Sequence, residues 1–130
     1  HNLDVNDRQE KTPTDGDVEA WPSDWLRATL GLAALRALEE GASYGYAIIA
    51  TLAGAGFGTI KGGTLYPLLS RFENAGLITT EWRPGEAGPG RKFFALTDTG
   101  RSTLARQRDE WTRFAGVVTD HLTTGRTPKP

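Results

Sequence analysis

The 130-residue chain contains no cysteine and only two histidines, His1 and His121. Without cysteine it cannot form disulfides or thiolate metal sites, and two histidines cannot build a His-rich zinc site. Every apolar run is far shorter than the roughly 18 residues that suggest a membrane span. No charged-then-apolar leader is present either. We therefore expect a cytoplasmic protein that binds no metal or cofactor and does not contact a membrane.

The net charge of −1 is distributed unevenly along the chain. Residues 1–42 carry four Lys/Arg against nine Asp/Glu, residues 57–97 carry five against three, and residues 98–130 carry six against four. Binding to a polyanion depends on local rather than total charge, so the later part of the chain is compatible with a modest basic face. Ordinary scatter explains the counts about equally well, and composition alone does not choose between the two.

Hydrophobic periodicity and turn residues divide the chain into four parts. Residues 1–22 contain six acidic residues and few apolar ones, so we expect an acidic tail. A compact domain is predicted over residues 23–97 and a long terminal helix over residues 98–124. Residues 125–130 are expected to form a second tail.

The first predicted helix runs from a Ser23 cap to about Glu40 and stops at Gly41. Its apolar residues form two stripes, one of which includes Leu26 and Leu30. A helix that is apolar on two sides is usually buried on two sides. One neighbour is expected to be its own domain and the other a partner subunit.

Two further helices follow. Ser43 is expected to cap a helix over residues 44–53, with Tyr46 in the core because of its helical spacing to Ile49. Pro67 is expected near the first turn of the third helix or at a kink, because proline lacks a backbone donor. This third helix carries a core-facing stripe made of Leu65, Leu68, Leu69 and Phe72.

Residues 77–83 and 91–96 are rich in β-branched or aromatic side chains and flank a Gly/Pro-rich loop. This arrangement predicts a β-hairpin. Thr97 or Asp98 then caps the last helix. That helix is roughly 40 Å long at about 1.5 Å per residue.

The last helix carries an apolar seam at coiled-coil spacing, interrupted by Arg108. The seam needs a partner long enough to cover it, so a homodimer is predicted. The expected seam residues are Leu104, Trp111, Ala115, Val118 and Leu122.

Three helices, a hairpin and a long helix form the order of a mainly α (α+β) fold, a winged helix-turn-helix with a C-terminal dimerisation helix. The chain also contains five distinctive short segments, which follow one another in the correct order and spacing over about residues 26–122. The segments that carry it are 41–46 (GASYGY), 63–69 (GTLYPLL), 73–78 (ENAGLI), 88–94 (GPGRKFF) and 96–101 (LTDTGR). These segments resemble the signatures of the PadR-like family of transcriptional regulators.

The resemblance implies a bacterial, homodimeric repressor that binds double-stranded operator DNA. Members of the family are often released by a small molecule, and a small hydrophobic effector is a candidate here. Two departures from the family pattern matter. Phe93 and Phe94 replace the usual tyrosines, so those hydroxyls cannot contact DNA here. Lys61 and Gly62 stand where the family often has a Ser-Pro helix start, which weakens the cap and adds a charge.

In a helix-turn-helix the second helix of the motif enters the major groove. The residues expected to face outward from it are Lys61, Thr64, Tyr66, Pro67, Ser70 and Arg71. Lysine and arginine can reach phosphates or guanine edges, and hydroxyls can bond either. Arg91 and Lys92 are expected to touch the DNA backbone or minor groove from the hairpin, and Tyr44 is a candidate phosphate ligand. Taken alone, a solvated helix face and a loop with incidental charge remain the alternatives.

Trp111 has two interpretations. It fits the seam as a dimer-core residue, and in some members of the family a tryptophan on this helix stacks against flat hydrophobic ligands. Trp25 or Phe114 could complete such a pocket.

No constellation of residues supports an enzyme. The glycine-rich segments at 54–58 and 85–92 lack the flanking residues and elements of nucleotide-binding loops, and no Ser/His/Asp set is available. The first alternative to DNA binding is a winged-helix module that binds another protein, since fold alone does not determine function. The second is a ligand-sequestering protein, which would need a large open pocket around Trp111.

Overall fold

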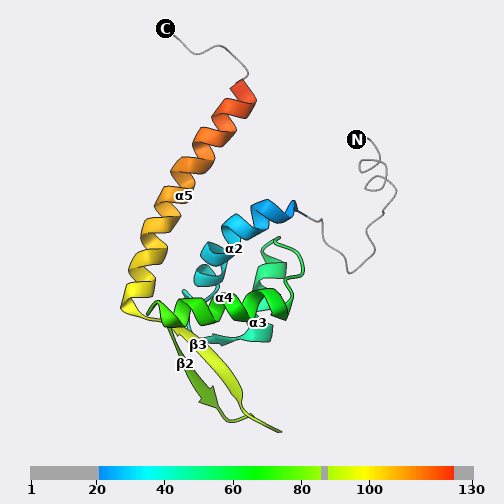
Figure 1. The fold of residues 1–130 in the computed structure, drawn as a ribbon, viewed down its shortest axis with the longest axis vertical. Helices are drawn as coiled ribbons and strands as arrows, with labels where there is room; N and C mark the ends of the chain where they lie inside the picture. The colour runs from blue at the N-terminus through cyan, green and yellow to red at the C-terminus, as the bar shows by residue number, and fades with distance from the viewer. Residues whose placement is uncertain (1–20, 86–87, 125–130) are drawn as a thin grey trace, which may run out of the picture.

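A computed structural model describes residues 21–85 and 88–124 of the chain (Figure 1). Within these residues, short helices and a small sheet form a body from which the last helix projects. The elements in chain order are α2 (Ser23–Ala37), β1 (Ser43–Tyr44), α3 (Gly45–Gly54), α4 (Gly62–Asn74), β2 (Ile78–Arg83), β3 (Arg91–Leu96) and α5 (Asp98–Thr124). The expected tail at 125–130, and that at 1–22 apart from Trp21 and Pro22, lie outside the described residues.

Every helix and the hairpin contribute to one hydrophobic core. The largest fully buried side chains are Leu35, Leu38, Ile48, Leu52, Leu65, Leu69, Ile78 and Leu104. Burying such a side chain contributes about 1.5–3 kcal/mol each. Among the described residues, no polar or charged side chain is buried. The stripe predicted on α4 is confirmed, since Leu65, Leu68 and Leu69 are buried and Phe72 packs against the core.

The start of α2 differs from the prediction. Pro22 occupies the N-cap position without a side-chain cap, and Ser23 is the first helical residue, so the Ser23 cap is wrong. The indole nitrogen of Trp21 donates a hydrogen bond to the carbonyl of Gly56, 2.8 Å away. This bond attaches the beginning of α2 to the turn that follows α3.

The expected cap at Ser43 is also wrong, because Ser43 and Tyr44 form the short strand β1. They pair antiparallel with Phe94 and Phe93 of β3, and α3 begins only at Gly45. The side of α3 that faces inward also differs from the prediction. Tyr46, expected in the core, is 76% exposed, and Ile48 is fully buried in its place. Long-range strand pairing therefore overrides the local capping signal.

The predicted hairpin and the start of the last helix are confirmed. β3 lies between β1 and β2, and the β2–β3 ladder runs from Ile78 opposite Leu96 to Arg83 opposite Arg91. The hydroxyl of Thr97 accepts a hydrogen bond from the Gly100 amide at 2.9 Å, which is N-capping geometry.

Gly100 lies directly against the backbone of the turn before β2. A Cβ there would lie 3.0 Å from the carbonyl carbon of Leu77 and closer still to its oxygen. That oxygen already accepts a hydrogen bond from the Thr97 amide at 3.0 Å. The absence of a side chain at Gly100 thus fixes where α5 leaves the body (Figure 1).

Candidate nucleic-acid interface

Helices α3 and α4 are joined by residues 55–61, and α4 presents one apolar and one polar side. Its apolar side is the buried stripe described above, which fixes its rotation. All six residues expected to face outward are exposed: Lys61, Thr64, Tyr66, Pro67, Ser70 and Arg71. Pro67 lies in the second turn of the helix, whereas the sequence predicts it near the first turn or at a kink. The burial pattern therefore leaves two cations and three hydroxyls exposed on α4 and its N-cap.

The cations of α4 are not occupied by neighbouring acids. Within the described residues seven ion pairs form, and neither Lys61 nor Arg71 takes part in them. Unpaired cations on an exposed helix can bind phosphate without first breaking an internal contact.

Tyr66 has a packing role that the sequence did not reveal. Its ring lies against Gly45 at the start of α3, where a Cβ would be 2.9 Å from its Cε1 atom and closer still to its hydroxyl end. On its own helix the ring lies near Gly62, where a Cβ would be 3.3 Å away. Tyr66 is still 45% exposed. It therefore holds α4 against α3 while presenting part of its ring to solvent.

The hairpin places its basic residues over aromatic rings. The guanidinium of Arg91 lies 4.3 Å from the ring centroid of Tyr44, and the Lys92 ammonium lies 5.8 Å from that of Phe94. Arg83, which has no local sequence signal as a site residue, lies 4.3 Å from the centroid of Phe93. Tyr44 was expected in the first turn of a helix and instead lies in β1 beside the basic hairpin.

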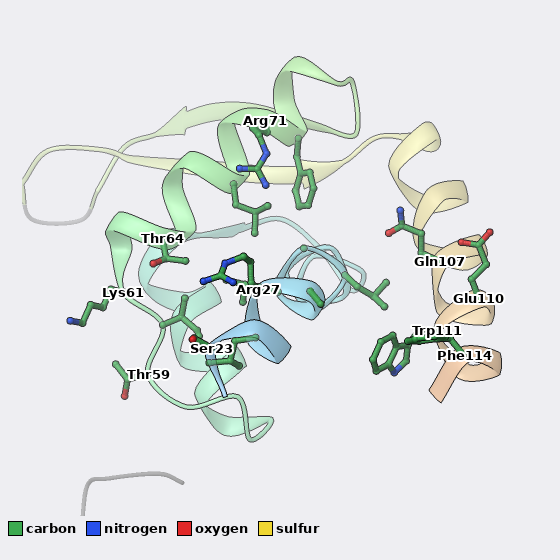
Figure 2. A pocket seen from close by; sticks show the side chains of 18 residues that line it. Ser23, Arg27, Thr59, Lys61, Thr64, Arg71, Gln107, Glu110, Trp111 and Phe114 are labelled. Carbon is green, nitrogen blue, oxygen red and sulfur yellow. The ribbon is translucent and has the colours of Figure 1, made fainter. Parts of the chain in front are cut away.

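A cleft of about 870 Å³ is lined by α2, α4 and α5 (Figure 2). Lys61, Thr64 and Arg71 line it from α4, and Trp111 and Phe114 extend into view from α5. Parts of the expected DNA-contact and ligand sites thus face the same space.

A second cleft, of about 600 Å³, lies between α2 and α5 and brings together Trp25, Trp111 and Phe114. The ring centroids of Trp111 and Phe114 are 6.0 Å apart. These are the three residues that were expected to form a ligand pocket. The same cleft is lined by five of the residues expected at a dimer interface, which are Leu26, Trp111, Ala115, Val118 and Leu122.

Two of the expected interface residues lie elsewhere. Leu30 and Leu104 are 6% and 1% exposed and belong to the core of the single chain. Leu104 sits in the second turn of α5, where the helix still packs on the body, so the exposed seam begins further along. By contrast Trp111, Val118 and Leu122 are 41%, 40% and 72% exposed. The exposed apolar face of α5 is therefore shorter than predicted, but it is still present.

The described residues hold no cluster of three or more potential metal ligands. No helix among them is long and apolar enough to cross a membrane.

The two-helix motif with its outward α4, followed by the hairpin, defines a winged helix-turn-helix protein. The chain matches the model of the transcriptional regulator PadR-like family over residues 34–106, from within α2 to within α5. The chain belongs to this family and is a DNA-binding transcriptional regulator rather than an enzyme. No curated protein is significantly similar to it in sequence.

Solved structures agree with this assignment. A PadR family regulator from Eggerthella lenta is 35% identical, with a TM-score of 0.70 over 78% of this chain and 88% of its own. A PadR-like transcription factor from Bacteroides fragilis is 32% identical, with a TM-score of 0.65 over 78% and 96%. A PadR-like regulator from Bacillus cereus is 28% identical, with a TM-score of 0.69 over 77% and 97%.

Proposed function

We propose that the chain is a repressor that binds operator DNA as a homodimer, with α4 in the major groove and the hairpin on the adjacent backbone. The observation that carries this proposal is the exposed side of α4. There Lys61, Thr64, Ser70 and Arg71 are exposed beside the buried stripe, and the two cations lack a carboxylate partner within the described chain. Arginine and lysine bind guanine edges or phosphates, and hydroxyls bind either.

The homodimer is supported by the apolar face of α5. Its large side chains beyond the second turn are exposed in the single chain and line a cleft together with Trp25 and Leu26 of α2. A contiguous exposed apolar surface marks an interaction site. In this proposal, residues 23–97 bind DNA and residues 98–124 dimerise.

The same cleft supports an effector site for a flat hydrophobic molecule. Trp25, Trp111 and Phe114 lie around one apolar space, which suits aromatic stacking. Because Trp111 also lines the larger cleft next to α4, a ligand that stacks on Trp111 would act beside the DNA-contact helix. Release of DNA on binding follows if the ligand favours a different angle between α5 and the body.

The test is fluorescence anisotropy of an operator duplex and a scrambled duplex across a salt series. A two-fold dimer should bind a pseudo-palindrome whose half-sites lie about 10 bp apart or a multiple of it. Thr64→Ala and Arg71→Ala should weaken the operator more than the scrambled duplex, by about 1–3 kcal/mol for a lost bidentate contact. Equal losses on both duplexes would remove sequence readout from α4.

The same titration separates DNA binding from the alternative function, in which the winged helix binds another protein. No detectable binding to any duplex from the protein's own promoter region at low salt would favour that alternative.

A further inference from the structure

The outer face of the sheet carries two aromatic rings with an arginine on each. Tyr44 and Phe93 are cross-strand neighbours whose ring centroids lie 5.2 Å apart, with a tilt of 59°. Arg91 lies over Tyr44 and Arg83 lies over Phe93, each at 4.3 Å from the ring centroid. The four side chains come from all three strands, so they assemble only when the sheet is complete.

The placement of the two arginines is unusual for a hairpin. Arg83 and Arg91 are directly opposite each other in the β2–β3 ladder. Like charges at such positions are normally destabilising. Cation–π contact offsets the repulsion, because each guanidinium lies over the negative face of a ring. The contact also restrains two long side chains, so less rotamer freedom is lost when they bind a ligand.

Both arginines keep binding capacity in this arrangement. A guanidinium whose flat face is held by a ring still has N–H groups in its plane, and these suit bidentate binding of phosphate oxygens. Arg83 remains 45% exposed and forms a long ion pair, 3.5 Å, with Glu81 on the same strand. An exposed pair of this kind contributes little and is readily exchanged for a stronger anion.

We propose that Arg83 and Arg91 together clamp the DNA backbone, and that Phe93 and Tyr44 are positioning residues for this clamp. Arg83 is then a DNA contact beyond those expected on the hairpin, and Glu81 weakens binding by competing with phosphate for it. The proposal rests on the proposed function, since it assigns a further contact to the same DNA-binding surface.

The first experiment measures anisotropy on operator and scrambled duplexes across a salt series. Arg83→Ala should weaken both duplexes about equally, by roughly tenfold for a lost charge-assisted contact. It should also reduce the slope of log affinity against log salt by about one. Glu81→Gln should tighten both duplexes by severalfold. The matched controls are Arg113→Ala and Asp109→Asn. In the native protein these two residues form an exposed ion pair on α5 with an N–O distance of 3.3 Å. They make the same charge changes and should alter binding by less than twofold.

A second experiment tests the role of Phe93 by a double-mutant cycle. In the native background Arg83→Lys should lose several-fold affinity, because lysine lacks the planar fork. In a Phe93→Leu background the same Arg83→Lys change should have no further effect, whereas in a Phe93→Tyr background it should cost as much as in the native protein. Equal stability in urea shows that the variants remain folded. A merely structural role for Phe93 would leave the Arg-to-Lys difference unchanged and would overturn the positioning role.

The outcomes separate this proposal from the proposed function. If the native protein binds its operator and Arg71→Ala weakens it, but Arg83→Ala matches Arg113→Ala, then the clamp is refuted and DNA binding stands. If the native protein binds no duplex, the proposed function fails and the clamp fails with it.

Discussion

The contact between Gly100 and the Leu77 carbonyl makes replacement by alanine a sharp test of how α5 is attached. The new Cβ would lie 3.0 Å from the carbonyl carbon of Leu77 and 3.2 Å from Cδ2 of Leu96. Ordinary carbon contacts are about 3.5–4.0 Å, so α5 and the turn before β2 must move apart. The nearest atoms belong to the backbone, and no side-chain rotation can relieve the clash.

The magnitude follows from three opposing effects. Overpacking of this kind costs about 1–3 kcal/mol. Moving the Leu77 carbonyl also weakens its hydrogen bond with the Thr97 amide, a further loss of about 0.5–1.5 kcal/mol. Alanine is favoured over glycine in a helix by up to about 1 kcal/mol, which offsets part of the loss. We expect Gly100→Ala to lower the free energy of unfolding by about 2–3 kcal/mol.

Urea denaturation at fixed protein concentration, followed by tryptophan fluorescence, measures this loss. Gly116→Ala on the same helix is the matched control, because a Cβ there meets nothing within 4 Å. It should raise stability by about 0.5–1 kcal/mol. Equal shifts of the urea midpoint in the same direction for both variants would show that the contact at Gly100 does not limit the packing of α5.

Three further predictions concern the association face, the ligand cleft and the packing of α4 on α3. Replacing Val118 and Leu122 together with Asp would bury charges against a partner at a cost of several kcal/mol; light scattering at low micromolar concentration should show a monomer, and a persisting dimer would place the interface elsewhere. Planar hydrophobic compounds should quench Trp111 fluorescence, and Trp111→Leu should abolish the response; saturation without any change in that signal would count against the cleft. Gly45→Ala should displace the Tyr66 ring and weaken operator binding, and adding Tyr66→Phe, which removes the hydroxyl nearest the new methyl group, should restore part of it; no recovery would argue against this contact.

The features that the sequence predicted correctly are those with local causes. The stripe on α4 follows from helical spacing alone, the hairpin from two strand-forming segments around a Gly/Pro loop, and the start of α5 from a Thr97 cap. The exposed residues of α4 followed in turn, because a known buried stripe fixes the opposite side.

The features that it missed depend on residues far apart in the chain. Ser43 carries an ordinary capping signal, yet pairing with Phe94, about 50 residues away, makes it part of a strand. Tyr46 matched the core by its spacing to Ile49, and only the packing of α3 shows that Ile48 is buried and Tyr46 is exposed. Arg83 had no local signal as a site residue, because its significance comes from a ring on the neighbouring strand. Leu104 matched the seam by spacing, and only the position of the body shows that its own chain already covers it.

The length of α5 has a consequence for how the regulator responds to dilution. The helix has 27 residues, but Gly100 and Leu104 are the only ones buried within the described chain, and both lie in its first two turns. As an isolated helix, the remaining portion would be only marginally stable in water unless another surface covers its apolar side. Helix content measured by circular dichroism should therefore fall as the protein is diluted, with fraying that starts at the C-terminal end. For the proposed homodimer, a low copy number in the cell would then mean the loss of the dimer and also of the ordered helix through which it forms.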